Sequence, residues 1–405
     1  MVRGILVRIA LFHNLPSGGA KRTVYEQVKR LTQRGHQIDL YSLSTANHDF
    51  ADVREFARRS IILPFSPGRL FRSPFGRLNQ GVRILDLLRL RGVMWALANE
   101  LDKHGYDVAL VHPCMFTFSP IILRYLHTPS LYYRHDPVRW LQDPETPRPY
   151  HRNSTWRRHL DRIDPLRNGY YRLLVREDVT SMRTATRVVT NSYFMRESLY
   201  RLYGVSPFVC YHGVDTDLFR PLRLPRENFV ISAGAIAPKK GYDFIIRSLA
   251  RIPQPARPRL ILVGNAALEE EQRYLAGLAQ QMEVEVEFRH LVTDQELVRL
   301  YNQALCTVYA PVMEPFGLVP LESMACGTPV VGIREGGVRE TVVDGQTGLL
   351  ADRSPDDFAA AITRLLDNLR LVEELGHQAR AYVEQKWHWE HAIDRLESHL
   401  QQVAR

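Results

Sequence analysis

Short apolar segments rich in β-branched residues alternate with amphipathic helical segments along this chain, and the alternation runs through two successive sets. In the first set, Ile5–Phe12, Ile38–Leu43 and Val108–Val111 have the length and composition of buried strands. The segment Ala20–Arg34 has apolar residues at helical spacing and is followed by Gly35, a residue that favours helix ends. Buried strands separated by helices are typical of a parallel sheet covered on both faces. The sequence therefore predicts an α/β fold.

The second set starts after Pro225, with strand-like segments at Phe229–Ala233 and Leu260–Val263. A chain of 405 residues is too long for one ordinary core and long enough for two. Doubly wound sheets bind ligands outside the carboxyl ends of their strands, so we expect two Rossmann-like domains that face a central cleft. The predicted parts are a first domain over 1–210, a linker over 211–225, a second domain over 226–375, and C-terminal helices over 376–405 that cross back to the first domain.

Composition excludes several classes of protein. The formal net charge of +9 comes mainly from arginine, but no helix-turn-helix, zinc-finger or RNA-binding aromatic pattern accompanies it, so we expect no nucleic acid partner. No apolar stretch reaches the roughly 18 residues of a membrane span, and Met1–Ala10 reads as a first strand, not as a signal peptide. The cysteines lie far apart without metal-binding spacing, which predicts buried thiols in a cytoplasmic protein: Cys114, Cys210, Cys306 and Cys326.

The segment that begins at Glu314 carries the strongest chemical signal. It follows a predicted strand and opens a predicted helix, so the backbone amides of Phe316, Gly317 and Leu318 would lie free at a helix N-terminus, where phosphate binds. Glu314 lies on the loop and would reach sugar hydroxyls, whereas Glu322 lies in the helix and would accept hydrogen bonds from a ribose diol. Simple stabilisation of the helix dipole is the alternative role for such a carboxylate.

Four residues of the first half are candidates for the opposite wall of the cleft. Gly18 and Gly19 lie between the first strand and the first helix, where glycine lets the backbone approach a phosphate or sugar closely, although a plain tight turn is the alternative. His112 and His135 follow two neighbouring strands and would face the same cleft. For each histidine, a purely structural role is the alternative.

These segments in combination resemble the retaining glycosyltransferases of family four, which have the GT-B fold. Glu314 and Glu322, with seven residues between them, match the paired glutamates of that family. The resemblance extends over nearly the whole chain, through Thr190–Gly204, the linker His212–Pro221, and the closing segments Gly336–Glu340 and Asp344–Leu350.

The resemblance implies a GT-B fold and a retaining transfer of a hexosyl group from a nucleotide-sugar to a glycan or lipid-linked acceptor. The expected setting is the synthesis of cell-surface polysaccharide or glycoconjugate. Tyr132–Arg139 resembles a segment of mannosyl-type members, which favours mannose or a related sugar and places His135 and Arg139 on the acceptor or sugar side. No cofactor is implied, because the nucleotide-sugar is a substrate.

The resemblance also assigns roles to individual residues. His112, Glu314 and Lys240 are the expected catalytic residues, and Lys239 joins the donor-binding set. In the family an arginine and a lysine hold the donor diphosphate, but Ala235 stands at the arginine position. Either Lys239 or another arginine takes that role, or donor activation is weak, or the protein has changed from transfer to binding.

Two other patterns need separate interpretations. Asp215-Thr216-Asp217 spells a metal-binding motif of a different glycosyltransferase class, but it lies in the linker, so we read it as a capping feature and expect no metal. Arginines and apolar residues are interspersed between Arg69 and Trp95, and a second basic run spans Arg148–Arg167. This pattern favours contact with an anionic membrane at its inner face; a solvated helix face and contact with a phosphorylated acceptor are the alternatives.

Two alternatives to the transferase remain. The same two-domain fold hosts nucleotide-sugar epimerases, which product analysis without acceptor would distinguish. A non-catalytic nucleotide-sugar-binding protein is the other, because of Ala235.

Overall fold

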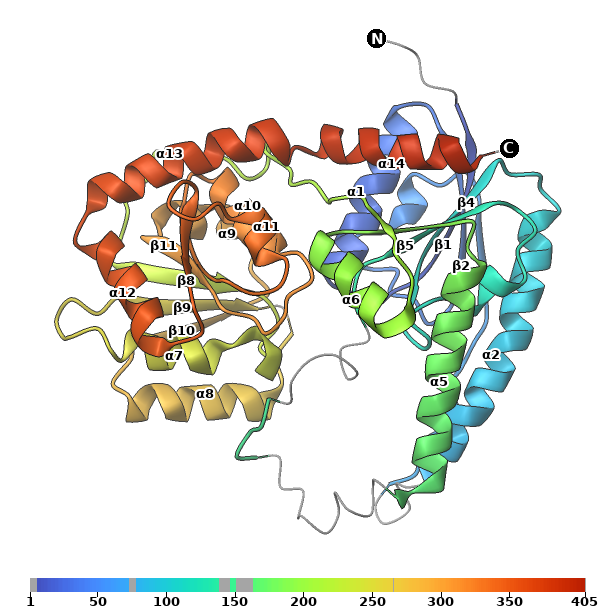
Figure 1. Ribbon diagram of the computed structural model, residues 1–405, viewed down its shortest axis with the longest axis horizontal. Coiled ribbons are helices and arrows are strands. Elements are labelled where there is room, and N and C mark those ends of the chain that lie inside the picture. The colour runs from blue at the N-terminus through green and yellow to red at the C-terminus, as the bar shows by residue number, and fades with distance from the viewer. Residues whose placement is uncertain (1–5, 73–77, 138–145, 151–162, 265, 405) are drawn as a thin grey trace.

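The computed structural model describes residues 6–72, 78–137, 146–150, 163–264 and 266–404. Two parallel sheets stand next to each other, each with helices on both faces (Figure 1). Within the described residues, the first sheet has the strand order β3-β2-β1-β4-β5-β6-β7 and the second has the order β10-β9-β8-β11-β12-β13. The predicted α/β fold with two Rossmann-like parallel sheets is therefore confirmed.

The first sheet comes from the first half of the chain. Its strands are β1 (Arg8–Asn14), β2 (Gln37–Leu43), β3 (Ser60–Leu63), β4 (Val108–Cys114), β5 (Ser130–Arg134), β6 (Arg187–Thr190) and β7 (Phe208–Val209). The helical segments around it are α1 (Gly19–Gln33), η1 (Val53–Glu55), α2 (Asn79–Asp102), η3 (Ile121–Arg124), α5 (Pro165–Thr184) and α6 (Tyr193–Tyr203).

The second sheet follows the linker. Its strands are β8 (Phe229–Ala233), β9 (Arg259–Gly264), β10 (Val286–His290), β11 (Cys306–Tyr309), β12 (Val330–Ile333) and β13 (Gly348–Ala351). Its helical segments are η4 (Pro238–Lys240), α7 (Tyr242–Leu249), α8 (Glu269–Gln281), α9 (Asp294–Gln303), α10 (Leu318–Ala325), α11 (Val338–Thr341), α12 (Pro355–Leu366) and α13 (Leu369–Lys386), and the chain ends with α14 (Trp389–Val403).

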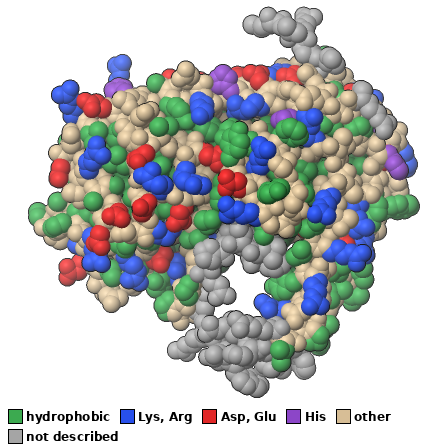
Figure 2. All heavy atoms as spheres, viewed as in Figure 1, with side chains coloured by type: hydrophobic (Ala, Val, Ile, Leu, Met, Phe, Trp, Pro, Cys, Tyr) green, Lys and Arg blue, Asp and Glu red, His purple; other side chains and the backbone are tan. Residues whose placement is uncertain are grey.

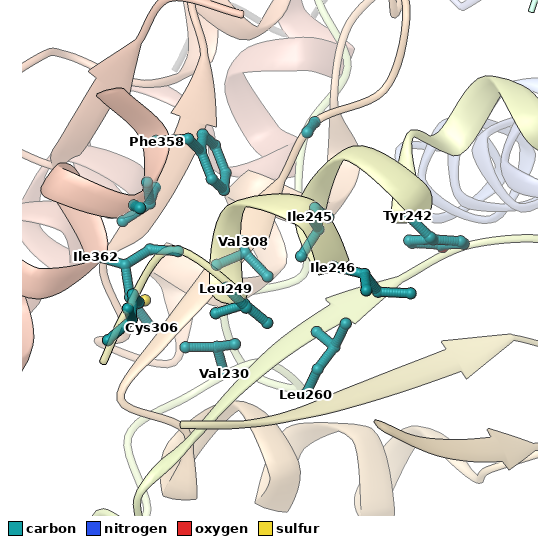
Figure 3. Packing of buried hydrophobic residues seen from close by; sticks show 14 of the residues in the cluster. Val230, Tyr242, Ile245, Ile246, Leu249, Leu260, Cys306, Val308, Phe358 and Ile362 are labelled. Atoms are coloured by element: carbon teal, nitrogen blue, oxygen red, sulfur yellow. The ribbon is translucent and has the colours of Figure 1, made fainter. Parts of the chain in front are cut away.

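Each sheet buries apolar side chains on both faces, because successive side chains along a strand point to opposite faces and helices cover both. In the second sheet, Val230 on β8, Leu260 on β9 and Val308 on β11 pack against Ile246 of α7 and Phe358 of α12 (Figure 3). All five side chains are fully buried. Full burial of such a side chain stabilises the fold by about 1.5–3 kcal/mol, so these layers fix where the strand ends lie.

The C-terminal helices connect the two sheets. Trp387, at the end of α13, is buried in the core of the second sheet, whereas Trp389 and Ile393 of α14 pack into the core of the first, beside α1 (Figure 1). Gly213 of the linker lies against this junction, and a β-carbon there would come within 2.6 Å of Trp389 Cα. The helix that crosses to the first domain is α14, which starts at Trp389. The exact domain boundaries stay predictions.

Strand bounds differ from the sequence-based expectation: the strand expected over Ile5–Phe12 is β1, over Arg8–Asn14. The strand expected to end at Val111 continues as β4 to Cys114, so His112 lies within the strand and not after it. The basic and apolar segment between Arg69 and Trp95 forms much of α2, which runs beside α5 away from the sheet (Figure 1). No helix in the described part of the chain is long and apolar enough to cross a membrane.

Candidate functional site

The loop before α10 and the η4 turn bring two predicted residues together. Lys240 Nζ lies 3.1 Å from Glu314 Oε2, an ion pair between segments far apart in sequence. Gly317 has a φ of 101°, in the left-handed region, and α10 begins at the next residue, Leu318. Its first amides therefore point out of the helix beside the ion pair, as an anion site requires. The side chain of Phe316 is buried in the core, so only its backbone faces the site.

The turn that carries Lys240 has little freedom. A β-carbon on Gly241, whose φ is 69°, would lie 2.1 Å from the carbonyl oxygen of Ala310, so the position requires glycine. The Lys239 carbonyl accepts a hydrogen bond from Val312 N, and the Lys239 side chain is partly exposed at the turn. Ala235 is exposed before the turn, so its side chain leaves room for a larger one. Beneath the turn, the buried hydroxyl of Tyr242 has no partner among the described residues.

Glu322 faces the first domain from α10. Its carboxylate accepts a hydrogen bond from the Tyr301 hydroxyl at 3.2 Å, and burial raises its pKa although the nearby Arg22 guanidinium lowers it. Arg22 comes from α1 of the other domain and forms a 2.6 Å ion pair with Asp294, at the start of α9. Glu322, Arg22 and Asp294 line a small pocket that also includes Asp215, Leu318 and Trp389. Sequence reasoning missed Arg22 and Tyr301, because no local pattern shows that they meet Glu322.

The glycine loop of the first domain lies directly opposite α10. A β-carbon built on Gly19 would be 3.8 Å from Leu318 Cδ1, so the first turn of α1 faces the first turn of α10. Gly18 has a φ of 145° and no atom within 4 Å of a built β-carbon, so backbone conformation and not crowding favours glycine there. The structure thus places Gly19 across from the α10 N-terminus, and the roles of Gly18 and Gly19 in donor binding stay predictions.

Three histidines form a stacked row at the carboxyl edge of the first sheet. We call His112, His135 and His212 the histidine row; the ring centroids of His112 and His135 are 5.2 Å apart, and those of His135 and His212 are 5.3 Å apart. His112 Nδ1 and His135 Nε2 share a hydrogen bond of 2.9 Å. Sequence reasoning found His112 and His135 as neighbours but assigned His212 only to the linker.

The hydrogen-bond partners determine much of the protonation of the row. Asn191 Nδ2 donates to His212 Nε2, so the hydrogen of neutral His212 lies on Nδ1, which donates to the Tyr133 hydroxyl. Burial lowers the pKa of His135 to about 4 and holds those of His112 and His212 well below the usual value, so the row is neutral at pH 7. His112 Nε2 and His135 Nδ1 are buried without partners in the described structure.

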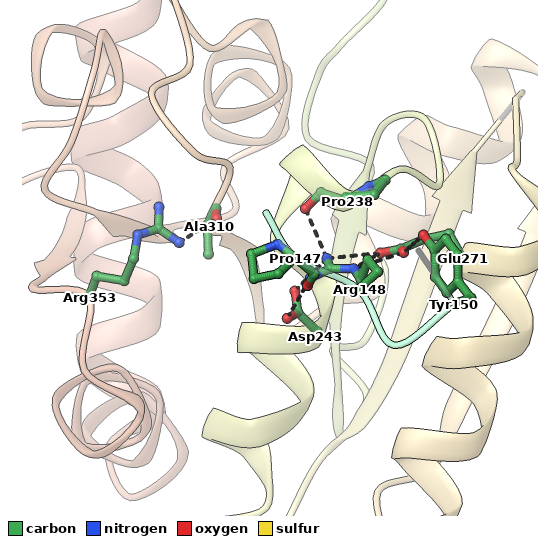
Figure 4. Close-up of polar contacts among 8 residues, drawn as sticks. All are labelled: Pro147, Arg148, Tyr150, Pro238, Asp243, Glu271, Ala310 and Arg353. Carbon is green, nitrogen blue, oxygen red and sulfur yellow. Dashed lines mark hydrogen bonds and ion pairs between the residues drawn. The ribbon is translucent and has the colours of Figure 1, made fainter. Parts of the chain in front are cut away.

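Some arginines of the two basic runs, Arg69–Trp95 and Arg148–Arg167, form ion pairs inside the protein. The two runs therefore do not form one continuous basic surface. Arg148 is buried against the second domain, where it binds Glu271, Asp243 and the Pro238 carbonyl (Figure 4). The segment 146–150 is thereby held beside the turn that carries Lys240. Arg91 is also used internally, in a 2.5 Å ion pair with the buried Glu177. Arg139 lies outside the described residues, as do four arginines of the second run: Arg152, Arg157, Arg158 and Arg162.

Asp215 acts as a capping residue in the linker. Its Oδ1 accepts hydrogen bonds from the amides of Asp217 and Leu218, and its Oδ2 lies 3.4 Å from Arg30 of α1. The Asp215 carboxylate thus stabilises a turn and a contact between the linker and the first domain.

Two family descriptions match the chain, one for each half. Residues 17–218 match Glycosyltransferase Family 4, and residues 214–382 match Glycosyl transferases group 1. The D-inositol 3-phosphate glycosyltransferase of Acidothermus cellulolyticus is 29% identical over 93% of this chain and 84% of its own length. An alpha-1,3/1,6-mannosyltransferase of Rhizomucor pusillus is 25% identical over 97% of this chain and 91% of its own. Among solved structures, Anabaena HepE in complex with UDP and glucose has a TM-score of 0.69 at 20% identity, covering 98% of this chain and 99% of that one.

Proposed function

The chain belongs to the GT-B glycosyltransferases that these two family descriptions cover, and we propose that it transfers a hexosyl group from a nucleotide-sugar donor with retention of configuration. The observation that carries the proposal is the Lys240–Glu314 ion pair beside the free α10 N-terminus, directly across from Gly19. A cation, a helix N-terminus and a glycine loop together fit a diphosphate.

In this proposal the donor spans the second domain. Glu322, which accepts a hydrogen bond only from Tyr301 in the described structure, accepts hydrogen bonds from the ribose diol. The diphosphate lies between Lys240 and the first amides of α10, and Glu314 binds hydroxyls of the sugar. His112 Nε2, buried and without a partner among the described residues, faces the sugar from the first domain.

Departure of the diphosphate is the step that the protein assists most. The bond between the anomeric carbon and the phosphate oxygen breaks, and the acceptor hydroxyl oxygen bonds to that carbon from the same face. The acceptor proton moves to the departing phosphate oxygen. Lys240 and the α10 amides stabilise the negative charge that develops on this diphosphate. Closure of the two domains over the sugar excludes water and limits hydrolysis.

A donor screen tests this function. Purified protein is mixed with mannose, glucose, galactose and N-acetylglucosamine donors, and binding is measured by calorimetry together with slow donor hydrolysis. We expect one donor to bind and Glu322→Ala to weaken its binding by about 10- to 100-fold, because two charge-assisted hydrogen bonds to ribose are lost. Asp294→Asn, at the edge of the same pocket, is the matched control for removal of a carboxylate.

The other outcomes of the screen distinguish the alternatives. Conversion of a donor sugar to its epimer without acceptor would replace the transferase by an epimerase. Binding without turnover, unchanged by Ala235→Arg, would indicate a nucleotide-sugar-binding protein. Ala235 is exposed, so the arginine fits without disturbing the fold.

We propose mannose or a related sugar as the donor sugar and a glycan or lipid-linked molecule as the acceptor. The Tyr132–Arg139 resemblance supports the sugar, and a mannosyltransferase among the relatives agrees with it. Synthesis of cell-surface polysaccharide or glycoconjugate at the cytoplasmic face of a membrane is the proposed setting.

The α2–α5 helix pair supports contact with an anionic membrane. Leu85 and Leu88 of α2 are 60% and 46% exposed, beside the exposed Arg83 and Arg89. Basic and hydrophobic side chains lie next to each other along this helix pair (Figure 2). Further exposed apolar residues of this region are Leu70, Phe71, Leu78, Trp95, Ile163 and Leu166. An apolar face with a cationic border binds an anionic bilayer in two ways: its apolar side chains are buried among the lipids, and its cations attract the lipid head groups.

Vesicle binding tests this contact. We expect co-sedimentation with vesicles of phosphatidylglycerol and phosphatidylcholine but not with phosphatidylcholine alone. Combined Leu85→Ser and Leu88→Ser changes should weaken the binding at least about tenfold, because two leucines no longer enter the bilayer. The matched control combines Leu268→Ser and Leu291→Ser, two leucines of the second domain that are 56% and 77% exposed. Equal binding of both double variants would contradict the proposed contact.

A further inference from the structure

Glu340 joins the two domains through the start of a helix. It lies on α11 of the second domain, and its carboxylate reaches the N-terminus of α6 in the first domain, which lies against α11 (Figure 1). Its Oε2 accepts a hydrogen bond of 2.9 Å from the amide of Tyr193, and its Oε1 accepts one of 2.8 Å from the amide of Phe194. The hydroxyl of Tyr211 in the linker also donates to Oε2, at 2.8 Å. One side chain thus binds the first domain and the linker together.

The start of α6 depends on this contact. The first amides of a helix have no partner within the helix, so side chains or water must accept their hydrogens. Ser192, the N-cap residue, accepts from the amide of Met195, and Glu340 accepts from the amides of Tyr193 and Phe194. A carboxylate suits this place because each of its oxygens accepts from one amide and its negative charge faces the positive end of the helix dipole. Glutamine has one acceptor oxygen, so it could serve only one of the two amides.

The same helix start is bound to the loop over 314–317, which we call the donor loop. Ser192 Oγ donates a hydrogen bond of 2.6 Å to the carbonyl of Pro315. On its other side the donor loop is fixed to the start of α11, because the amide of Gly337 donates to the Glu314 carbonyl at 2.8 Å. A β-carbon on Gly337 would lie 2.3 Å from the Pro315 carbonyl oxygen, so the two backbones are in direct contact. The donor loop and α11 therefore form one packed unit, and both parts of it are bound to α6.

The histidine row contacts the same helix start from inside the first domain. Asn191, the residue before the N-cap, donates from Nδ2 to the carbonyl of His135 at 3.0 Å and to His212 Nε2 at 3.3 Å. The donor loop also contacts the row directly, since the rings of Phe316 and His212 meet edge to face with their centroids 5.2 Å apart. The start of α6 therefore lies between the donor loop and the histidine row and is bound to both.

We propose that Glu340 is a positioning residue for the transfer reaction: by capping α6 across the domain boundary, it holds the donor loop at a fixed place beside the histidine row. Under the proposed function, the diphosphate is bound within the second domain, whereas the sugar lies between the two domains. Loss of the cap should therefore disturb the reacting geometry more than the affinity for the donor. The role in transfer rests on the proposed function; the cap itself does not.

Amide hydrogen exchange tests the cap without any ligand. In the intact protein, the amides of Tyr193 and Phe194 should exchange slowly, because an acceptor from the other domain covers them. Glu340→Gln should speed the exchange of at least one of these amides by at least about tenfold, since a charge-assisted hydrogen bond is lost. Glu197→Gln is the matched control: it removes an exposed carboxylate of α6 that pairs with Arg201, and both amides should stay within about twofold of the wild type.

Steady-state kinetics tests the positioning, with the donor that the screen identifies. Glu340→Gln should lower kcat by about 10- to 100-fold, whereas the donor affinity measured by calorimetry should stay within about threefold of the wild type. Ser192→Ala removes the hydrogen bond to Pro315 and should also lower kcat. The double variant should lose less than the product of the two separate losses, because both residues act through one helix start. Glu197→Gln should leave kcat unchanged.

Each other outcome would overturn the proposal. Unchanged exchange in Glu340→Gln would mean that the carboxylate does not cap α6. Faster exchange with unchanged kcat would reduce Glu340 to a structural cap, and equal losses of kcat and donor affinity would assign it to donor binding. If the wild type turns over no donor, the proposed function fails and the role in transfer fails with it, while the exchange comparison still decides whether Glu340 joins the two domains.

Discussion

Replacing Lys240 by alanine is expected to lower the rate of transfer by about 10²–10³-fold, because the leaving diphosphate loses its cation in the second domain. The effect should appear in kcat, since charge on the diphosphate grows as the bond to the sugar breaks. Donor affinity should fall less. The measurement is steady-state transfer or donor hydrolysis with the donor identified by the screen.

The control for Lys240 removes a lysine of the same charge from the surface. Lys103→Ala interrupts an exposed ion pair with Glu100 and should leave kcat unchanged. Ala235→Arg added to Lys240→Ala should restore part of the rate, because the new guanidinium comes from the start of the same turn. An unchanged kcat in Lys240→Ala would remove the proposed role of this lysine, whatever the donor.

Replacing Arg134 by methionine is expected to destabilise the first domain by about 3–5 kcal/mol. Arg134 and Asp178 are both buried, and Arg134 Nη1 lies 2.7 Å from Asp178 Oδ1. Among the described residues, the variant leaves the buried Asp178 carboxylate with two donors, the Ser119 amide and the Tyr203 hydroxyl. Urea unfolding measures the loss in the free energy of unfolding, and amide hydrogen exchange on β5 measures it locally.

A double variant distinguishes an uncompensated charge from lost packing. Arg134→Met with Asp178→Leu removes both charges and should recover most of the stability, because apolar groups replace a buried ion pair well. Arg201→Met, in an exposed ion pair with Glu197, should cost less than about 1 kcal/mol. A loss in the double variant as large as in Arg134→Met alone would contradict this account.

Arg134 also connects stability to the candidate site. Its Nε donates to the Asp136 carbonyl at 2.6 Å, across the backbone of His135. The ion pair therefore orients the residue that shares a hydrogen bond with His112. Amide exchange at 134–136 should rise in Arg134→Met, together with the global loss of stability.

Local patterns were sufficient for the parts of the site that follow one another in sequence. The sequence around Glu314 predicted a strand, then a loop, then a helix that contains Glu322. The structure contains all three, with the helix starting at Leu318. The Gly18–Gly19 turn could also be predicted from sequence, because the positive φ of Gly18 and the start of a helix depend on neighbouring residues. The sequence alone showed that Ala235 stands where the family has an arginine. The structure adds that Ala235 is exposed.

The sequence by itself determined the fold class, the two walls of the cleft and most donor-side candidates, because periodicity and turn chemistry act over a few residues. Only the tertiary structure decided which side chains meet across the cleft or within the sheet. Arg22 reaches Asp294, Arg148 reaches Glu271, and Glu340 reaches the start of α6. Such contacts depend on strand order, on the direction of each side chain along its helix and on burial, and none of these is local to the residues concerned.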